Sequence, residues 1–193
     1  PENPDGDFLY NGRGASNSVS KAKQIIAGSP IPKAYGGFGT ELEYKGISLG
    51  MTFTYKIGGK LYDAGSKDVA EDGYYWERIR SEHGIKEVWR PDYTDALLPK
   101  VSGNDPEDGI TNSTRHLYDA SFLRLKQINL AYRIPASITE KARISNARIF
   151  FNGTNLLTFS KFKLADPEVN QYGTRGWETP FGKTYSFGLE FSL

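Results

Sequence analysis

The sequence predicts an all-β fold, in which antiparallel strands form part of a transmembrane β-barrel. Three observations support this prediction: the alternation of apolar and polar residues, the alternation of short and long connections, and strand lengths that suit a bilayer. The clearest alternation runs from Lys183 to Leu193, where every second residue is apolar up to the last one. Because side chains alternate between the faces of a strand, one face is apolar and the other is small or polar. The closing strands of bacterial outer-membrane barrels have this pattern.

Five strands are predicted, and the second is the most regular. They cover roughly residues 35–45, 47–57, 122–134, 147–157 and 183–193. In the third strand the apolar residues change face partway, so we expect a β-bulge near Lys126 or Gln127. The fourth is less regular because Phe150 and Phe151 lie on opposite faces. Five strands cannot close a membrane barrel, since such barrels begin at about eight strands. The chain is therefore expected to be part of a larger barrel.

The connections between these strands alternate in length. Lys45 and Gly46 form a two-residue hairpin signal between the first two strands. Roughly sixty residues follow before the third strand, then a short link over 135–146 with room for one helical turn, then about twenty-five polar residues. An up-and-down barrel has this order, with short periplasmic turns and long external loops. The second and fifth strands also have the nine to eleven residues, roughly, that a tilted membrane strand needs.

Aromatic residues lie near both ends of the predicted strands. Amphipathic rings collect at membrane interfaces, so we expect two aromatic girdles. The alternative is that aromatic residues simply favour strands. The predicted girdle residues are Tyr35, Tyr55, Phe122, Phe159 and Tyr185 at the loop ends and Tyr44 and Tyr132 at the turn ends.

Composition excludes several other classes of protein. The chain has 193 residues, a net charge of +1 and no cysteine, and its mean hydropathy is −0.53. The absence of a run of eighteen apolar residues excludes membrane-spanning helices, and the charge gives no reason to expect nucleic acid as a partner. The chain begins at Pro1 without a signal segment, so we expect a processed product or a piece of a longer protein. Residues 1–34 are expected to form a loop, and 35–193 the strands and their loops.

An ordered series of motifs resembles the late barrel hairpins of SusC/RagA-type TonB-dependent transporters. The resemblance runs from about Ile31 to the end of the chain, and it is the order of the motifs that makes it specific. The motifs are Ile31–Gly39 followed by Leu42–Gly46, Tyr55–Asp63, Phe122–Lys126, Asn152–Phe159, Asp166–Asn170 and Lys183–Leu189.

This resemblance implies much more than the residues show. It implies a twenty-two-stranded outer-membrane barrel of Bacteroidota, plugged by an N-terminal domain and energised through TonB. Such barrels import oligosaccharides or peptides together with a SusD-like surface lipoprotein, and their outer walls contact lipid and lipopolysaccharide. The chain contains no plug domain and no segment that would contact TonB, so the resemblance places it in the last five strands of the barrel.

The long loops carry the candidate ligand-binding residues. Aromatic faces suit the C–H groups of sugar rings, so we take Trp76, Trp89 and Trp177 as candidates for substrate contact. The alternative is that these rings pack the loops against one another or against the lipoprotein. His83 and His116 have no paired base or nucleophile and are expected at the surface or in loops. No motif indicates a catalytic residue, a metal site or a cofactor.

Three classes of function remain open on the sequence. A component of an outer-membrane importer agrees with the loop lengths, the strand faces and the motif series. An outer-membrane enzyme or an autotransporter barrel would need a catalytic group in the lumen. A soluble β-sandwich that binds carbohydrate would use its exposed loop aromatics as the binding site.

Overall fold

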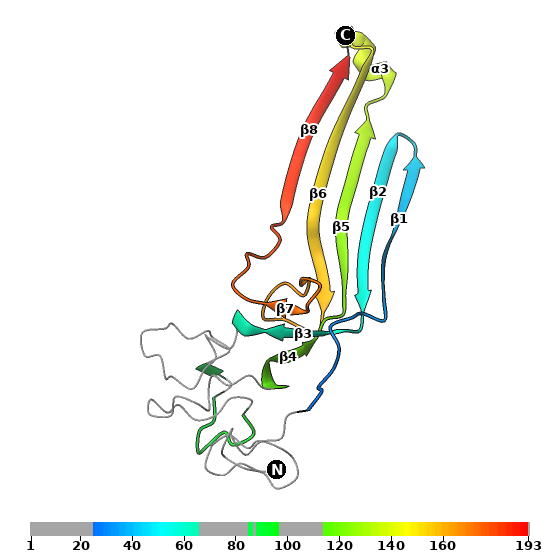
Figure 1. The fold of residues 1–193 in the computed structure, drawn as a ribbon. Helices are drawn as coiled ribbons and strands as arrows, with labels where there is room; N and C mark the ends of the chain where they lie inside the picture. Colours follow the sequence, from blue (N-terminus) through cyan, green and yellow to red (C-terminus); the bar gives the residue numbers. More distant parts are fainter. Residues whose placement is uncertain (1–24, 66–84, 87, 97–113, 193) are drawn as a thin grey trace. The chain divides into compact units, whose positions relative to one another are not determined.

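The computed structural model describes residues 25–65, 85–86, 88–96 and 114–192. They belong to two compact units. One unit, here the long-strand unit, comprises residues 30–59, 119–169 and 179–193 and contains a five-stranded sheet (Figure 1). The described parts of the other unit contain most of a small three-stranded sheet, and we refer to it as the small-sheet unit.

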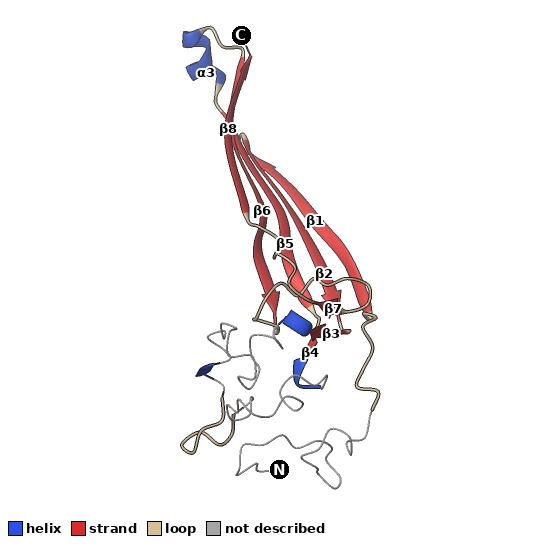
Figure 2. Ribbon diagram, turned by 60° about the vertical axis from the view of Figure 1, so that its left-hand side comes forward, coloured by secondary structure: helices blue, strands red, loops and turns tan. Residues whose placement is uncertain are grey.

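The five-stranded sheet is antiparallel throughout, and its strands follow one another in chain order. Figure 2 shows these strands as one continuous twisted sheet. The prediction of five long strands in an up-and-down order is confirmed. The strands are β1 (Ala34–Tyr44), β2 (Ile47–Ile57), β5 (Phe122–Arg133), β6 (Asn146–Ser160) and β8 (Thr184–Ser192).

Local backbone chemistry explains both short connections. Lys45 and Gly46 have φ values of 47° and 83°, and positive φ at both central residues is the hairpin geometry that matches strand twist. After β5 the chain forms α3 (Ala136–Thr139) and the 3-10 helix η3 (Glu140–Ala142), which is the predicted helical turn. Figure 1 shows α3 beyond the end of the sheet.

A β-bulge interrupts the ladder where the sequence predicted one. Lys126 has no partner in the register with either β2 or β6, and residues 155 and 156 of β6 are also left out of the pairing. Asn155 has a positive φ of 53°. Because the extra residue shifts the alternation, the apolar residues on both sides of Lys126 face the same way.

The register therefore gives the sheet one apolar face and one polar face. Directly opposed residues share a face, and Leu42, Leu49 and Leu130 form one such row across three strands. Ring pairs such as Phe38 with Phe53, at 5.1 Å between centroids, and Phe151 with Phe187, at 4.9 Å, belong to this apolar face.

Two of the predicted girdle residues lie on the opposite face. Tyr35 and Phe122 are both paired with Lys56, which belongs to the polar face. The other five predicted girdle residues share the apolar face. The girdle prediction is wrong for Tyr35 and Phe122, because strand ends alone do not show which way a ring points. The side chain of Phe122 instead lies against Arg124, with 5.4 Å between the ring centroid and Cζ.

The small sheet was not predicted. Its strands are β4 (Leu117–Asp119), β3 (Lys60–Asp63) and β7 (Thr174–Arg175), in the order β4-β3-β7. β3 and β7 are parallel. Strands of two to four residues are too short to produce a periodic pattern in the sequence.

Buried residues hold this small-sheet unit together. Leu61 and Asp63 are fully buried, and Arg175 donates a hydrogen bond to Asp63 over 3.1 Å. His116, in the 3-10 helix η2 (Thr114–His116), is buried rather than at the surface. The surface expectation is wrong for His116 because its ring packs edge-on against Tyr62, with 6.4 Å between centroids. Among the helices of the described residues, none has the length and apolar character needed to cross a membrane.

Candidate functional site

The apolar face of the five-stranded sheet is largely uncovered. Phe187 is 76% exposed, Leu189 60% and Leu42 58%. Soluble monomers rarely expose a continuous apolar surface of this extent. The alternation along each strand and the register between strands bring these side chains to one side, so the face has the chemistry of a lipid-contacting barrel wall.

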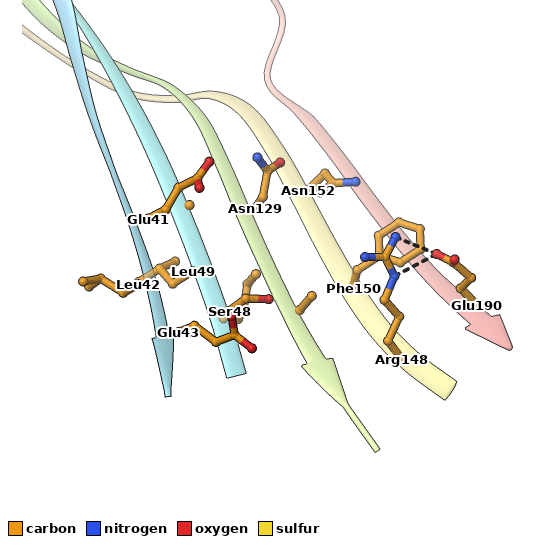
Figure 3. A pocket seen from close by; sticks show the side chains of 13 residues that line it. Glu41, Leu42, Glu43, Ser48, Leu49, Asn129, Arg148, Phe150, Asn152 and Glu190 are labelled. Carbon is orange, nitrogen blue, oxygen red and sulfur yellow. Dashed lines mark hydrogen bonds and ion pairs between the residues drawn. The ribbon is translucent and has the colours of Figure 1, made fainter. Parts of the chain in front are cut away.

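The polar face carries the small and hydrophilic residues and contains a recess of about 620 Å³. Figure 3 shows its lining, in which Glu41, Asn129 and Asn152 extend from different strands. Arg148 and Glu190 form an ion pair in this recess, with Nε and Nη2 donating to Oε2 over 2.7 and 2.6 Å. A wall of this composition suits a wet interior rather than lipid.

Phe150 is the one large apolar ring in the recess, and a glycine explains its position. It is paired with Gly188 on β8. A Cβ added at Gly188 would lie only 2.6 Å from Cε1 of Phe150. The ring therefore packs over the backbone of the glycine. This contact removes part of the apolar surface of the ring from water on an otherwise polar face.

Arg124 forms the most buried charged cluster on the polar face, and its side chain is 1% exposed. Nη2 donates to Asp166 over 2.5 Å, Nη1 to Glu168 over 3.0 Å, and Nε to the hydroxyl of Thr158 over 3.2 Å. A buried guanidinium is tolerated because its donors are paired in this way. The cluster joins β5, β6 and the loop that follows β6.

The sequence motifs contained Arg124 and Asp166 but did not show that they meet. The two residues are 42 positions apart. The sequence offered one signal, a charged residue between the apolar neighbours Leu123 and Leu125. This signal indicates only that Arg124 lies on the face opposite the apolar one. Which carboxylates pair with it depends on the path of the loop.

The three predicted tryptophans are placed differently. Trp76 lies outside the described residues. Trp89 and Trp177 both belong to the small-sheet unit. Trp89 is half-buried, and its indole N–H has no acceptor among the described residues. Trp177 is 70% exposed.

Trp177 sits on an ordered turn. Hydrogen bonds from the backbone N–H groups of Glu178 itself and of Gly176 lower the pKa of the Glu178 carboxyl. The Gly176 N–H donates to Oε2 over 2.6 Å. The backbone on both sides of Trp177 is therefore held while its ring faces solvent. Across the described part of the chain, no group of three residues is arranged to bind a metal ion.

No family model matches the chain, but two curated relatives do. TonB-dependent receptor P26 of Formosa agariphila is 27% identical over 173 residues, which cover 89% of this chain and 17% of that receptor. TonB-dependent receptor P3 of the same organism is 29% identical over 165 residues, covering 86% of this chain and 16% of the receptor. The chain thus spans about a sixth of the length of these relatives.

Solved structures give the same result. A structure of the RagAB peptide transporter matches 98% of this chain with a TM-score of 0.74 and 26% identity, over 21% of that chain. The RagAB peptide importer in its closed-closed state matches 95% of this chain with a TM-score of 0.72 and 28% identity, over 20% of that chain. These proteins are receptors and transporters rather than enzymes. Sequence and structure together confirm the predicted resemblance to SusC/RagA-type TonB-dependent transporters, for which this chain corresponds to part of a larger barrel.

Proposed function

We propose that this chain forms part of the wall and the external loops of a TonB-dependent importer in the bacterial outer membrane. The observation that carries the proposal is the two-faced sheet, because an uncovered apolar face and a polar face with a recess suit lipid on one side and a wet passage on the other. Similarity to TonB-dependent receptors and to the RagAB importer supports it. The apolar face would contact membrane lipid and lipopolysaccharide.

The same comparison supports the partners and substrates that we propose. In this proposal the external loops meet a SusD-like surface lipoprotein, and TonB engages a part of the protein outside this chain. The imported nutrient is an oligosaccharide or a peptide, and the description of RagAB as a peptide importer supports the second. Trp76, Trp89 and Trp177 are proposed to contact the nutrient. The exposed ring of Trp177, on its ordered turn, supports this assignment best.

Shortening the loop over residues 65–112 in the full-length protein tests this function. The barrel should fold, since the strands lie outside the deletion, whereas co-purification of the lipoprotein or growth on the imported nutrient should fall. Glu140→Ala with Lys141→Ala in the link between β5 and β6 is the matched control and should change neither. If the full-length protein co-purifies with no lipoprotein and its deletion alters growth on no glycan or peptide, the importer function is wrong.

The alternative functions have less support. In a soluble sandwich the apolar face would be packed against a second sheet, whereas Leu42, Phe187 and Leu189 are exposed. An outer-membrane enzyme or autotransporter barrel would agree with the strands. No comparison names an enzyme or an autotransporter among the relatives described above.

A further inference from the structure

We propose that Arg124 is a positioning residue that fixes both ends of the segment 169–180 to the polar face of the sheet. Both ends of the last long loop are then held at the sheet, and the exposed aromatic residues lie between these two points of attachment. The inference rests on the proposed function where it concerns nutrient capture. The attachment of the loop is a separate claim about the structure.

The position of Arg124 within β5 is the first step. Its partners in the ladder are Thr54 on β2 and Thr158 on β6, so it projects from the polar face among small hydroxyl residues. The side chain is 1% exposed. A guanidinium held among such neighbours presents its donors in fixed directions, because its fork is planar and rigid.

The first end of the segment is attached through two carboxylates. Asp166 and Glu168 each accept a hydrogen bond from a different terminal nitrogen of Arg124. Oδ1 of Asp166 also accepts the backbone N–H of Glu168 over 2.9 Å. Pro167 between them restricts φ. The turn at 166–168 is thus held by the strand and by its own backbone.

The second end is attached through Phe181 and Gly182. The centroid of the Phe181 ring lies 5.3 Å from Cζ of Arg124 and 5.0 Å from Nζ of Lys126, distances at which cations bind aromatic faces. Nδ2 of Asn155 donates to the carbonyl of Gly182 over 3.2 Å. Lys126 and Asn155 are among the residues that the bulge leaves out of the ladder, and bulges commonly redirect side chains in this way.

Arg124 therefore contacts both ends of the same loop. Fixing both ends reduces the conformations open to the chain between them, and a surface ordered before binding loses less entropy when a ligand arrives. The segment between the ends carries Tyr172, 73% exposed, and Trp177. Because its donors are used within the protein, Arg124 acts through the loop rather than by touching the nutrient.

The test uses the full-length protein in outer-membrane vesicles, with a spin label on Tyr172→Cys. Arg124→Gln should strongly reduce the immobilised component of the spectrum while the barrel keeps its heat-modifiable mobility on gels; a remainder is expected because β7 still pairs with β3. Phe181→Ala removes the ring contact with Arg124 at the second end of the loop only, so it should reduce this component in part. Arg148→Gln is the matched control, because it removes a different ion pair of the polar face, that with Glu190, and should leave the spectrum unchanged.

An unchanged spectrum in Phe181→Ala or in a folded Arg124→Gln barrel overturns the inference, as does an equal loss in Arg148→Gln. If Arg124→Gln prevents folding, Phe181→Ala alone decides. Growth on the imported nutrient separates the two proposals. If the wild-type protein imports no nutrient, the proposed function is wrong, and the spectra still test the attachment of the loop. If the protein is a working importer and Arg124→Gln frees the loop without changing uptake, Arg124 has no role in nutrient capture.

Discussion

The two faces of β2 can be compared directly by placing the same charge on neighbouring residues. Met51 lies on the apolar face, opposite Thr40 and Ile128, and Thr52 lies on the polar face, opposite Gly39 and Gln127. We expect Met51→Arg in the full-length barrel to be strongly destabilising and Thr52→Arg to be much milder. The two variants share charge, side-chain size and depth, so only the face differs.

The expected magnitude follows from the depth of Met51 in the bilayer. β2 has 11 residues. At about 3.4 Å per residue and a tilt of about 40°, each residue advances about 2.6 Å along the membrane normal. The strand then spans roughly 26 to 29 Å, close to the apolar band of about 25 Å. Met51 is next to the central residue, so it lies within about 3 Å of the midplane.

An arginine at the midplane of a barrel wall costs about 2 to 4 kcal/mol, which lowers the folding equilibrium constant roughly 30- to 700-fold. Thr52→Arg places its charge in the wet interior and avoids this desolvation cost. The free energy of unfolding is measured by guanidinium titration in lipid vesicles, with reversibility checked for each variant. Equal penalties, or a larger one for Thr52→Arg, would refute the assignment of the faces.

Three further predictions concern topology, packing and the binding loop. Tyr172→Cys should react with a membrane-impermeant maleimide on intact cells and Lys141→Cys should not, because external loops face the medium and short links the periplasm; the reverse pattern would invert the topology. Gly188→Ala should lower the free energy of unfolding by about 1 to 3 kcal/mol, because the added methyl group overlaps Phe150. In a Phe150→Ala background most of this cost should disappear, and additive effects in the double variant would contradict the packing. Trp177→Ala should weaken growth on limiting nutrient without changing barrel folding, and unchanged growth would remove Trp177 from the substrate-contact assignment.

Some features were predictable because they depend on short stretches of chain. The bounds of β2, the turn at Lys45 and Gly46 and the bulge at Lys126 all agree with the expectation. Alternation with a period of two is a property of the strand backbone, and a two-residue turn needs only its own residues to adopt positive φ. A change of phase in the alternation likewise locates a bulge within the strand that contains it.

Other features depend on pairing and could not be predicted in this way. The direction of Tyr35 and Phe122 follows from their register with Lys56. The short strands β3, β4 and β7 exist only because distant segments pair with one another. His116 is buried because of its contact with Tyr62, and no local sequence pattern predicts that contact.

The sequence alone was enough to predict two-faced strands joined by alternately short and long connections, and its ordered motifs indicated the resemblance to SusC/RagA-type transporters that the comparisons confirm. Which charges meet could be seen only in the folded chain. Arg124 reaches Asp166 and Glu168 across more than forty residues, and Phe181 completes the cluster from still further along the chain. Strand periodicity is a local property of the backbone, whereas a buried ion pair depends on the register between several strands and on the path of the loop that connects them.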